Sequence, residues 1–260
     1  MTRADEIPTT VALNSGGAMP MVGFGTWQLR GETAYSAVRT ALQVGYRHLD
    51  TATIYGNEAE VGRALRDSGA PRAEVFVTTK VPPERAGRER ATLAASLRAL
   101  GTEYVDLWLV HWSPPGRALL PLWTELMAAQ EEGLVRAVGV SNYSVREIDQ
   151  LIEASGRAPA VNQVPWNPAS HDPDQLAAHR ERGVVLEGYS PLKRTRLRDR
   201  TLTAIASAHG VSPAQVVLRW HLQHGIPVIP RSARPERIRS NFDLRSFALS
   251  PDEMSRLDTL

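Results

Sequence analysis

The chain has 260 residues, of which 42% are hydrophobic and 22% are charged, and its formal net charge is +2. This composition is typical of a globular protein with a substantial core, and no linker or compositional break divides it, so we expect one domain over residues 1–260. The densest basic cluster, residues 193–200, contains no aromatic residue, which argues against a nucleic-acid surface. Because there is no cysteine and no apolar stretch of signal-peptide or membrane-span length, we expect a cytoplasmic protein without disulfides or a membrane partner.

The N-terminal residues predict a β-hairpin. Residues 10–13 and 19–21 have the pattern of short strands, and the Asn-Ser-Gly-Gly stretch at 14–17 is a hairpin signal between them. We expect this hairpin to plug or cover one end of the fold.

From residue 22 onward, predicted strands and helices alternate. Eight βα units in a chain of this length predict a closed (β/α)8 TIM barrel, an α/β fold with a parallel sheet inside and helices outside. A doubly wound sheet is the alternative, but its phosphate-binding turn G-x-G-x-x-G is missing after the first strand. Strands are expected at 22–27, 46–50, 75–80, 105–110, 136–141, 160–164, 184–189 and 226–230. Helices are expected at 32–44, 57–65, 89–100, 121–132, 145–154, 173–182, 201–223 with a break near Gly210, and 235–242.

The residues at the ends of these strands are polar or aromatic and suited to chemistry. In a TIM barrel the active site lies at the C-terminal ends of the strands. Eight such ends in one chain are an improbable coincidence for a purely structural rim. In chain order they are Thr26 and Trp27, Asp50, Lys80, His111, Ser141 and Asn142, Gln163, Tyr189 and Ser190, and Arg231 and Ser232.

Lys80 is unusual by composition. The chain has 30 lysines and arginines together, but its only lysines are Lys80 and Lys193. A lysine kept at a strand end suggests a need for a compact ammonium rather than a guanidinium. Tyr55 follows Asp50 on the same loop, and a nearby cation would lower the pKa of its phenol from about 10, which would suit it to act as an acid.

The strand-end residues lie within eight short sequence motifs, and together these motifs resemble the aldo-keto reductase family over essentially the whole chain. Within the family, the general flavour is nearest to the bacterial 2,5-diketo-D-gluconate reductase branch. The resemblance implies NADPH-dependent reduction of an aldehyde or ketone, with catalytic residues Asp50, Tyr55, Lys80 and His111. Tyr55 would donate a proton, and Lys80, held in place by Asp50, would lower the pKa of Tyr55. His111 would orient the carbonyl oxygen. The motifs are GFGTW at 23–27, HLDTATIYGNE at 48–58, VTTK at 77–80, LVHW at 109–112, GVSN at 139–142, NQV at 162–164, YSPL at 189–192 and IPRSARPERIRSNFD at 229–243.

The resemblance also implies how NADPH/NADP+ is held. Ser141, Asn142 and Gln163 would bind the nicotinamide carboxamide, and Tyr189 would stack on its ring. Arginine binds phosphate through bidentate hydrogen bonds, so a 2′-phosphate site is expected at the last βα turn. The remaining cofactor positions are Gly25, Thr26 and Trp27 at the first strand, Ser190 and Leu192 along the pyrophosphate, Arg231, Ser232 and Arg237 at the phosphate, and Asn241 at the adenine. The family often has lysine at position 231 and glutamate at position 240, where this chain has Arg231 and Ser240.

Substrate contacts are expected from an aromatic pocket. Trp27, Tyr55, His111 and Trp112 would surround the carbonyl of a small molecule. The loop at 112–119 is short, and the chain ends at residue 260, where relatives commonly continue into a loop that closes over the substrate. We therefore expect an open pocket.

Other activities remain as alternatives. Lys80 could form a Schiff base in an aldolase, and a nucleotide-binding regulatory subunit could keep the cofactor residues without turnover. No metal ion is expected, because His48 and Asp50 lack a second histidine pair to complete a ligand set. A monomer is expected, since a barrel buries its core without a partner.

Overall fold

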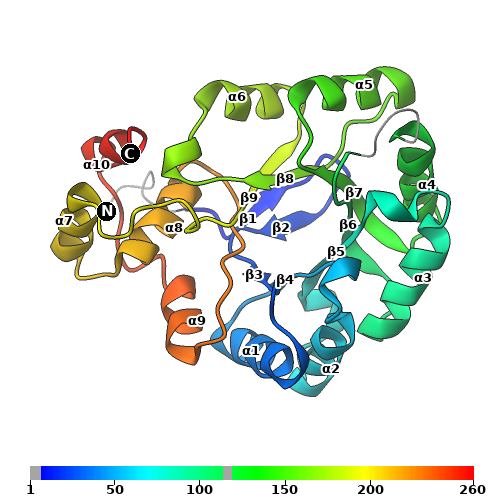
Figure 1. The fold of residues 1–260 in the computed structure, drawn as a ribbon, viewed down its shortest axis with the longest axis horizontal. Coiled ribbons are helices and arrows are strands. Elements are labelled where there is room, and N and C mark those ends of the chain that lie inside the picture. The colour runs from blue at the N-terminus through cyan, green and yellow to red at the C-terminus, as the bar shows by residue number, and fades with distance from the viewer. Residues whose placement is uncertain (1–6, 114–118) are drawn as a thin grey trace.

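The computed structural model describes residues 7–113 and 119–260. Within these ranges the chain forms a barrel of parallel strands ringed by helices, preceded by an antiparallel hairpin, which confirms the expected TIM-barrel class (Figure 1). The strands are β1 (Thr10–Ala12), β2 (Ala18–Pro20), β3 (Phe24–Gly25), β4 (His48–Asp50), β5 (Phe76–Val81), β6 (Val105–Val110), β7 (Val135–Ser141), β8 (Val161–Pro165) and β9 (Val185–Tyr189). The helices are α1 (Gly31–Val44), α2 (Glu58–Ser68), α3 (Glu89–Leu100), α4 (Leu119–Glu131), α5 (Val145–Ser155), α6 (Pro173–Glu181), α7 (Arg200–His209), α8 (Pro213–Gln223), α9 (Pro235–Phe242) and α10 (Pro251–Leu257).

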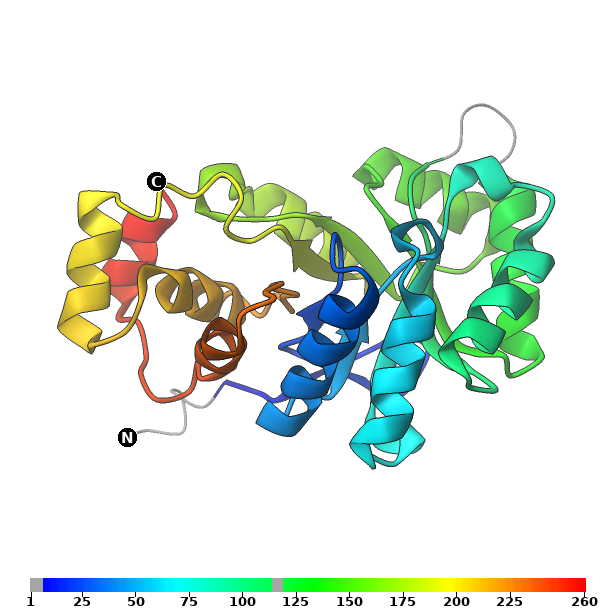
Figure 2. The same cartoon turned by 60° about the horizontal axis from the view of Figure 1, so that its bottom comes forward.

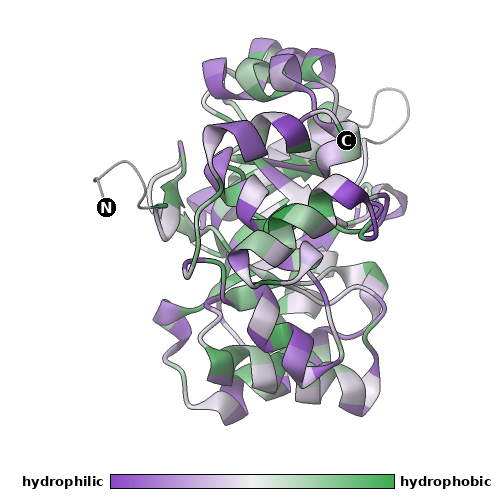
Figure 3. Ribbon diagram, turned by 90° about the vertical axis from the view of Figure 1, so that its left-hand side faces the viewer, coloured by the Kyte–Doolittle hydropathy of each residue, from purple (hydrophilic) through white to green (hydrophobic). Residues whose placement is uncertain are grey.

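The barrel sheet runs in chain order from β3 to β9, and each pair of neighbours is parallel. Side chains alternate between its two faces, as the period of a strand requires. In β6, Leu107 and Leu109 join the cluster inside the barrel, whereas Trp108 and Val110 join the large cluster beneath the helices. The helices complete the outer layer, and hydrophilic and hydrophobic segments alternate along them (Figure 3).

The hairpin β1–β2 closes the N-terminal end of the barrel, as expected. Met19 is fully buried and packs in the same cluster as Leu107. The Asn14 side chain donates to the carbonyl oxygens of Pro159 and Gly183, both at 3.1 Å. These two carbonyls lie just before β8 and β9, so a pocket can open only at the opposite end, where the strands finish.

The eighth expected strand, at 226–230, is not a regular strand, so that prediction is wrong in detail. Pro227 and Pro230 have no N–H to donate to a ladder. The segment nevertheless closes the barrel, because Val228 forms isolated parallel bridges to both sides. Its hydrogen bonds include Gly23 N to Val228 O (2.9 Å), Val228 N to Met21 O (2.9 Å), Gly188 N to Pro227 O (2.8 Å) and Gly25 N to Pro230 O (3.1 Å).

The expected break near Gly210 is confirmed and has a local cause. Gly210 ends α7 in the left-handed region, with φ of 65°, and Ser212 begins α8 with a capping box. The last helix, α10, was not predicted from the sequence. Among the described residues, no helix is long and apolar enough to cross a membrane.

Candidate active site

The centre of the site is a buried ion pair between neighbouring strands. Successive side chains of a strand point to opposite faces of the sheet, and this alternation directs Asp50 of β4 and Lys80 of β5 into the barrel. Both side chains are almost fully buried there. Lys80 Nζ lies 2.7 Å from each carboxylate oxygen of Asp50 and 2.9 Å from the carbonyl oxygen of Thr51. Burial is the largest single influence and by itself would lower the pKa of Lys80, but the interactions with Asp50, Tyr55 and Glu187 together outweigh it, so the pKa is raised. Lys80 is therefore held as an ammonium ion.

Tyr55 lies above this ion pair. It ends a short 3-10 turn (Thr53–Tyr55) that follows β4, and its hydroxyl oxygen is 3.4 Å from Lys80 Nζ. Burial raises the pKa of Tyr55 by more than Lys80 lowers it, so the net shift is upward. Lys80 lowers the pKa of Tyr55, as expected, but burial keeps the pKa above 10. The phenol stays protonated at neutral pH and keeps a proton to donate.

His111 faces Tyr55 from the end of β6. Their ring centroids are 5.7 Å apart, and His111 also stacks on Trp112 at 3.9 Å. Burial, assisted by the positive charge of Lys80, lowers the pKa of His111 to about 2. Its Nδ1 atom has no hydrogen-bond partner among the described residues. A neutral imidazole in this position can hydrogen-bond to a carbonyl oxygen without adding a charge.

A hydrogen-bond network links the ends of β7, β8 and β9. Ser141 Oγ donates to the carbonyl oxygen of Gln163 at 2.8 Å. Asn142 Nδ2 donates to Ser141 Oγ at 3.0 Å and to the carbonyl oxygen of His111 at 3.1 Å, while Asn142 Oδ1 accepts from the Tyr189 hydroxyl at 2.8 Å. The two N–H groups of the Asn142 amide are thus used within the protein. Its oxygen can accept a further hydrogen bond from a ligand.

Gln163 connects this network to a second buried acid. Its Nε2 donates to Asp50 Oδ2 and to Glu187 Oε2, both at 2.8 Å. Glu187 is fully buried, and burial, together with the charge of Asp50, raises its pKa to about 8. His48 lies 3.7 Å from Glu187, and burial lowers its pKa to about 4. Glu187 was missed in the sequence analysis, although an acid at an inward position of the strand pattern was a usable signal.

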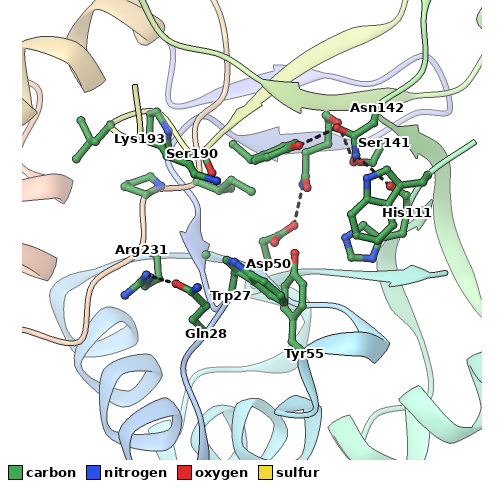
Figure 4. A pocket seen from close by; sticks show the side chains of 18 residues that line it. Trp27, Gln28, Asp50, Tyr55, His111, Ser141, Asn142, Ser190, Lys193 and Arg231 are labelled. Atoms are coloured by element: carbon green, nitrogen blue, oxygen red, sulfur yellow. Dashed lines mark hydrogen bonds between the residues drawn. The ribbon is translucent and has the colours of Figure 1, made fainter. Parts of the chain in front are cut away.

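A pocket of about 540 Å³ lies at the C-terminal end of the barrel, and Asp50, Tyr55, His111 and Gln163 are among the residues that line it (Figure 4). Trp27 and Trp112 are 47% and 42% exposed. Large exposed aromatic side chains at the rim of a pocket are typical of a ligand-binding surface. Part of the loop expected to leave the pocket open, residues 114–118, lies outside the described residues. The pocket contains most of the predicted residues, namely Gly25, Trp27, Asp50, Tyr55, His111, Trp112, Ser141, Asn142, Gln163, Tyr189, Ser190, Leu192 and Arg231.

Five predicted residues do not line the pocket. Lys80 lies beneath it, and Thr26 is buried with its hydroxyl donating to the carbonyl oxygen of Asp50 at 2.9 Å, which is a structural bond. Ser232 and Asn241 are also buried, and Ser232 Oγ accepts from the backbone N–H of Arg234 at 3.0 Å. The fifth, at position 237, is an exposed arginine of α9. Hence the structure groups the predicted catalytic residues closely, whereas the predicted phosphate residues extend along the segment that follows the pocket.

The pocket also has residues that the sequence analysis missed. Arg231 Nη2 donates to Gln28 Oε1 at 2.8 Å, so two loops meet across its edge (Figure 4). Lys193 lines it too, and its rarity in the sequence was the available signal. Three non-glycine residues of the described chain have positive φ, Gln28 at 65°, Asn142 at 63° and Ser190 at 51°, and all three line the pocket. Such backbone strain clusters at functional sites, and no sequence signal pointed to it.

Comparison with known proteins agrees with this geometry. The profile described as the aldo/keto reductase family matches residues 21–260. An aldo-keto reductase of Mycolicibacterium vanbaalenii is 45% identical over 100% of this chain and 94% of its own length. One from Mycobacterium tuberculosis is 43% identical over 96% of this chain and 90% of its own.

Solved structures give the same result. An aldo/keto reductase from Brucella melitensis superposes with a TM-score of 0.93 at 41% identity, covering 97% of this chain and 99% of that one. The aldose reductase of Schistosoma japonicum superposes with a TM-score of 0.90 at 31% identity, covering 96% and 91%. The chain therefore belongs to the aldo/keto reductase family, whose members reduce carbonyl compounds with nicotinamide cofactors.

Proposed function

We propose that the protein reduces an aldehyde or ketone to an alcohol with NADPH, using Tyr55 as the proton donor. The observation that carries this proposal is the position of the Tyr55 hydroxyl, which borders the pocket 3.4 Å from the buried ammonium of Lys80. Neutral His111 lies on the other side of the same space. A carbonyl oxygen between Tyr55 and His111 could accept hydrogen bonds from both.

The four residues divide the work of the reaction. Bound NADPH supplies the hydride. Tyr55 donates its proton to the oxygen on which negative charge develops, and Lys80 stabilises the phenolate that remains. Asp50 fixes Lys80 as an ammonium ion through two hydrogen bonds of 2.7 Å. His111 orients the oxygen without competing for the proton, because the pKa of His111 is lowered to about 2.

The polar groups near β7 and β8 fit a nicotinamide carboxamide. Asn142 and Gln163 have committed their N–H groups to protein acceptors, which leaves their amide oxygens to accept from the carboxamide NH₂. Tyr189 lines the same pocket, tethered through its hydroxyl, and its ring would stack on the nicotinamide. Ser190, Leu192 and Lys193 continue along the pocket wall, where a pyrophosphate would pass.

The segment from Arg231 to α9 fits the 2′-phosphate and adenosine end. Arg231 lines the pocket, and Arg237 is exposed on α9, where a guanidinium can reach an anion at the start of a helix. Ser232 and Asn241 lie on the same segment. A preference for NADPH over NADH requires positively charged side chains that contact the 2′-phosphate, which NADH lacks. The segment from Arg231 to α9 is therefore the proposed origin of that preference.

The geometry disfavours the aldolase. A Schiff base needs a neutral amine that reaches the substrate, whereas Lys80 is charged, lies below the pocket and donates to three oxygens within 2.9 Å. A regulatory subunit remains possible only if the catalytic set is inactive. The same experiment distinguishes these functions.

The test is NADPH oxidation with a panel of carbonyls, including methylglyoxal, an aromatic aldehyde and a diketo sugar acid, in wild type and Tyr55→Phe. We expect wild-type turnover to fall by a factor on the order of 10² to 10⁴ in Tyr55→Phe, with NADPH affinity unchanged. NADPH binding without turnover on any carbonyl would favour the regulatory role. Substrate trapped on Lys80 by borohydride would favour the aldolase.

The monomeric state stays a prediction, which light scattering would test.

A further inference from the structure

Two histidines and an aspartate meet on the outside of the barrel, away from the pocket. His171 follows the short 3-10 turn Pro168–Ser170 after β8, His224 caps the end of α8, and Asp258 caps the end of α10. One ligand atom from each lies within 4.8 Å of the other two. Helices α8 and α10 lie side by side at one end of the molecule, with α7 next to them (Figures 1 and 2). None of the three residues lines the catalytic pocket.

His171 is a buried imidazole with no hydrogen-bond partner for its ring within the described chain. Its side chain is only 8% exposed, and its Nδ1 atom is buried without a partner. Its Nε2 atom faces Asp258 Oδ1 at 3.7 Å, which is too long for a hydrogen bond. Within the described chain Nε2 therefore has no hydrogen-bond partner, and this ring nitrogen, on the side of Asp258, is available to bind a ligand.

The two distances from the histidines to Asp258 Oδ1 lie on either side of the donor spacing at a tetrahedral metal ion. Zinc bonds of about 2.0–2.1 Å to nitrogen and oxygen put neighbouring donors roughly 3.4 Å apart. The pair His171 and Asp258 is at 3.7 Å, slightly wider, and the pair His224 and Asp258 is at 2.8 Å, slightly narrower. The His224 and Asp258 side chains are 19% and 29% exposed, so water can complete the fourth position.

The surroundings favour a metal ligand set over a simple salt bridge. Trp220 Nε1 donates to Asp258 Oδ1 at 2.7 Å, which orients the carboxylate as outer hydrogen bonds do at metal sites. The His171 ring packs edge-on against Trp166 and Trp220.

We propose that His171, His224 and Asp258 form a binding site for a divalent transition-metal ion, of which zinc is the best match. Two imidazoles and one carboxylate suit zinc, nickel, cobalt and copper rather than magnesium or calcium, which require oxygen ligands. The ion clamps α10 to α8 and to the loop after β8. This site departs from the expectation that no metal is bound, because its ligands are far apart in the sequence and show no motif spacing.

A matched control exists on the same helix. His209 Nε2 lies 2.9 Å from Glu253 Oε1, so this pair also joins a histidine to α10, but no second imidazole takes part. If any histidine–carboxylate pair sufficed, His209→Ala would weaken metal binding. If the proposal is correct, only His171→Ala and His224→Ala do so.

The experiment is a titration of the metal-stripped protein with Zn²⁺ by calorimetry and with Co²⁺ by visible absorption. We expect one ion per chain, an absorption spectrum of tetrahedral Co²⁺, and a melting temperature that rises with Zn²⁺. His171→Ala should weaken Zn²⁺ binding at least about tenfold and remove the rise, while His209→Ala keeps both. Because His171 makes no hydrogen bond to α10, this variant should retain the fold, which circular dichroism checks.

Two outcomes would overturn the site. One is the absence of stoichiometric binding to the wild type. The other is equal affinity in His171→Ala and wild type. If His171→Ala fails to fold, the Co²⁺ spectrum of the wild type decides the question, since a spectrum of six oxygen donors contradicts two imidazole ligands.

Discussion

The amide of Gln163 is hydrogen-bonded to the carboxylate of Asp50, with Nε2 2.8 Å from Oδ2. A residue proposed to bind the cofactor is thus attached to the acid that holds Lys80. Any ligand that moves the Gln163 amide also acts on the ion pair, and through it on the proton donor. The proposed cofactor site and the proposed catalytic set are parts of one hydrogen-bond network.

This connection predicts that Gln163→Leu affects both binding and turnover. The change leaves the buried carboxyl of Glu187 without a hydrogen-bond donor among the described residues, which costs about 1–3 kcal/mol, and it leaves Lys80 as the donor to the Asp50 carboxylate. We expect kcat to fall about tenfold and the Kd for NADPH to rise, measured by steady-state kinetics and cofactor fluorescence. Gln130→Leu is the control, because Gln130 donates to the carbonyl oxygen of Arg136 in an exposed position far from the pocket. Unchanged kcat in Gln163→Leu would contradict the coupling.

The buried ion pair predicts strong non-additivity between Asp50 and Lys80. Lys80→Met leaves a buried carboxylate without its cation, and we expect a loss of about 3–5 kcal/mol in the free energy of unfolding. Asp50→Asn together with Lys80→Met removes both charges and should cost less than the sum of the single changes. Urea denaturation of the four proteins measures this cycle. Additive losses would show that the two groups do not act as a pair.

Buried Glu187 predicts a loss of stability as the pH rises above 6.5. Its folded-state pKa is raised from 4.5 to about 8, so its stabilising contribution is full below 4.5 and is lost as the pH rises toward 8. His48 has the opposite sign, because its pKa is lowered from 6.5 to about 4 and its contribution is lost only as the pH falls below 6.5.

Of Glu187 and His48, only Glu187 therefore changes the free energy of unfolding between pH 6.5 and 8, because it gains its negative charge in this range. The slope should approach, at most, about 1.4 kcal/mol per pH unit. Glu187→Gln keeps an acceptor for Gln163 and should flatten the slope. Urea denaturation of wild type and variant at pH 6.5, 7.2 and 8.0 measures it. An equal slope in both proteins would mean that Glu187 titrates as an ordinary acid.

The arginine on α9 predicts cofactor discrimination. Arg237→Ala should raise the Kd for NADPH about tenfold, equivalent to about 1.4 kcal/mol, and leave the Kd for NADH nearly unchanged, because only NADPH has the 2′-phosphate. Arg239→Ala removes a second exposed arginine of the same helix and is the control. Equal losses for NADPH and NADH in Arg237→Ala would place the phosphate elsewhere.

Much of the fold was predictable because local patterns determine it. Alternation of strands and helices indicated the barrel, and the period of two within β4 and β5 placed Asp50 and Lys80 on the same inner face. Gly210 marked the break between α7 and α8 in the sequence, because glycine is the preferred residue at a helix C-terminus.

What escaped prediction depends on contacts between distant segments. Glu187 meets Asp50 only through Gln163, and Gln28 meets Arg231 only when the barrel closes. The pKa of Tyr55 depends on how deeply its ring is buried, which competes with the charge of Lys80 in a balance that no sequence pattern reports.

The closing segment around Val228 also protects the protein from association with itself. A closed barrel has no edge strand with which a second chain could pair. In this barrel the closure is made by isolated bridges at Val228 and by hydrogen bonds of the residues around it. If the joint opened briefly, Pro227 and Pro230 would offer no N–H group to an intruding strand. The two prolines therefore reduce the capacity of this segment to pair with a second chain.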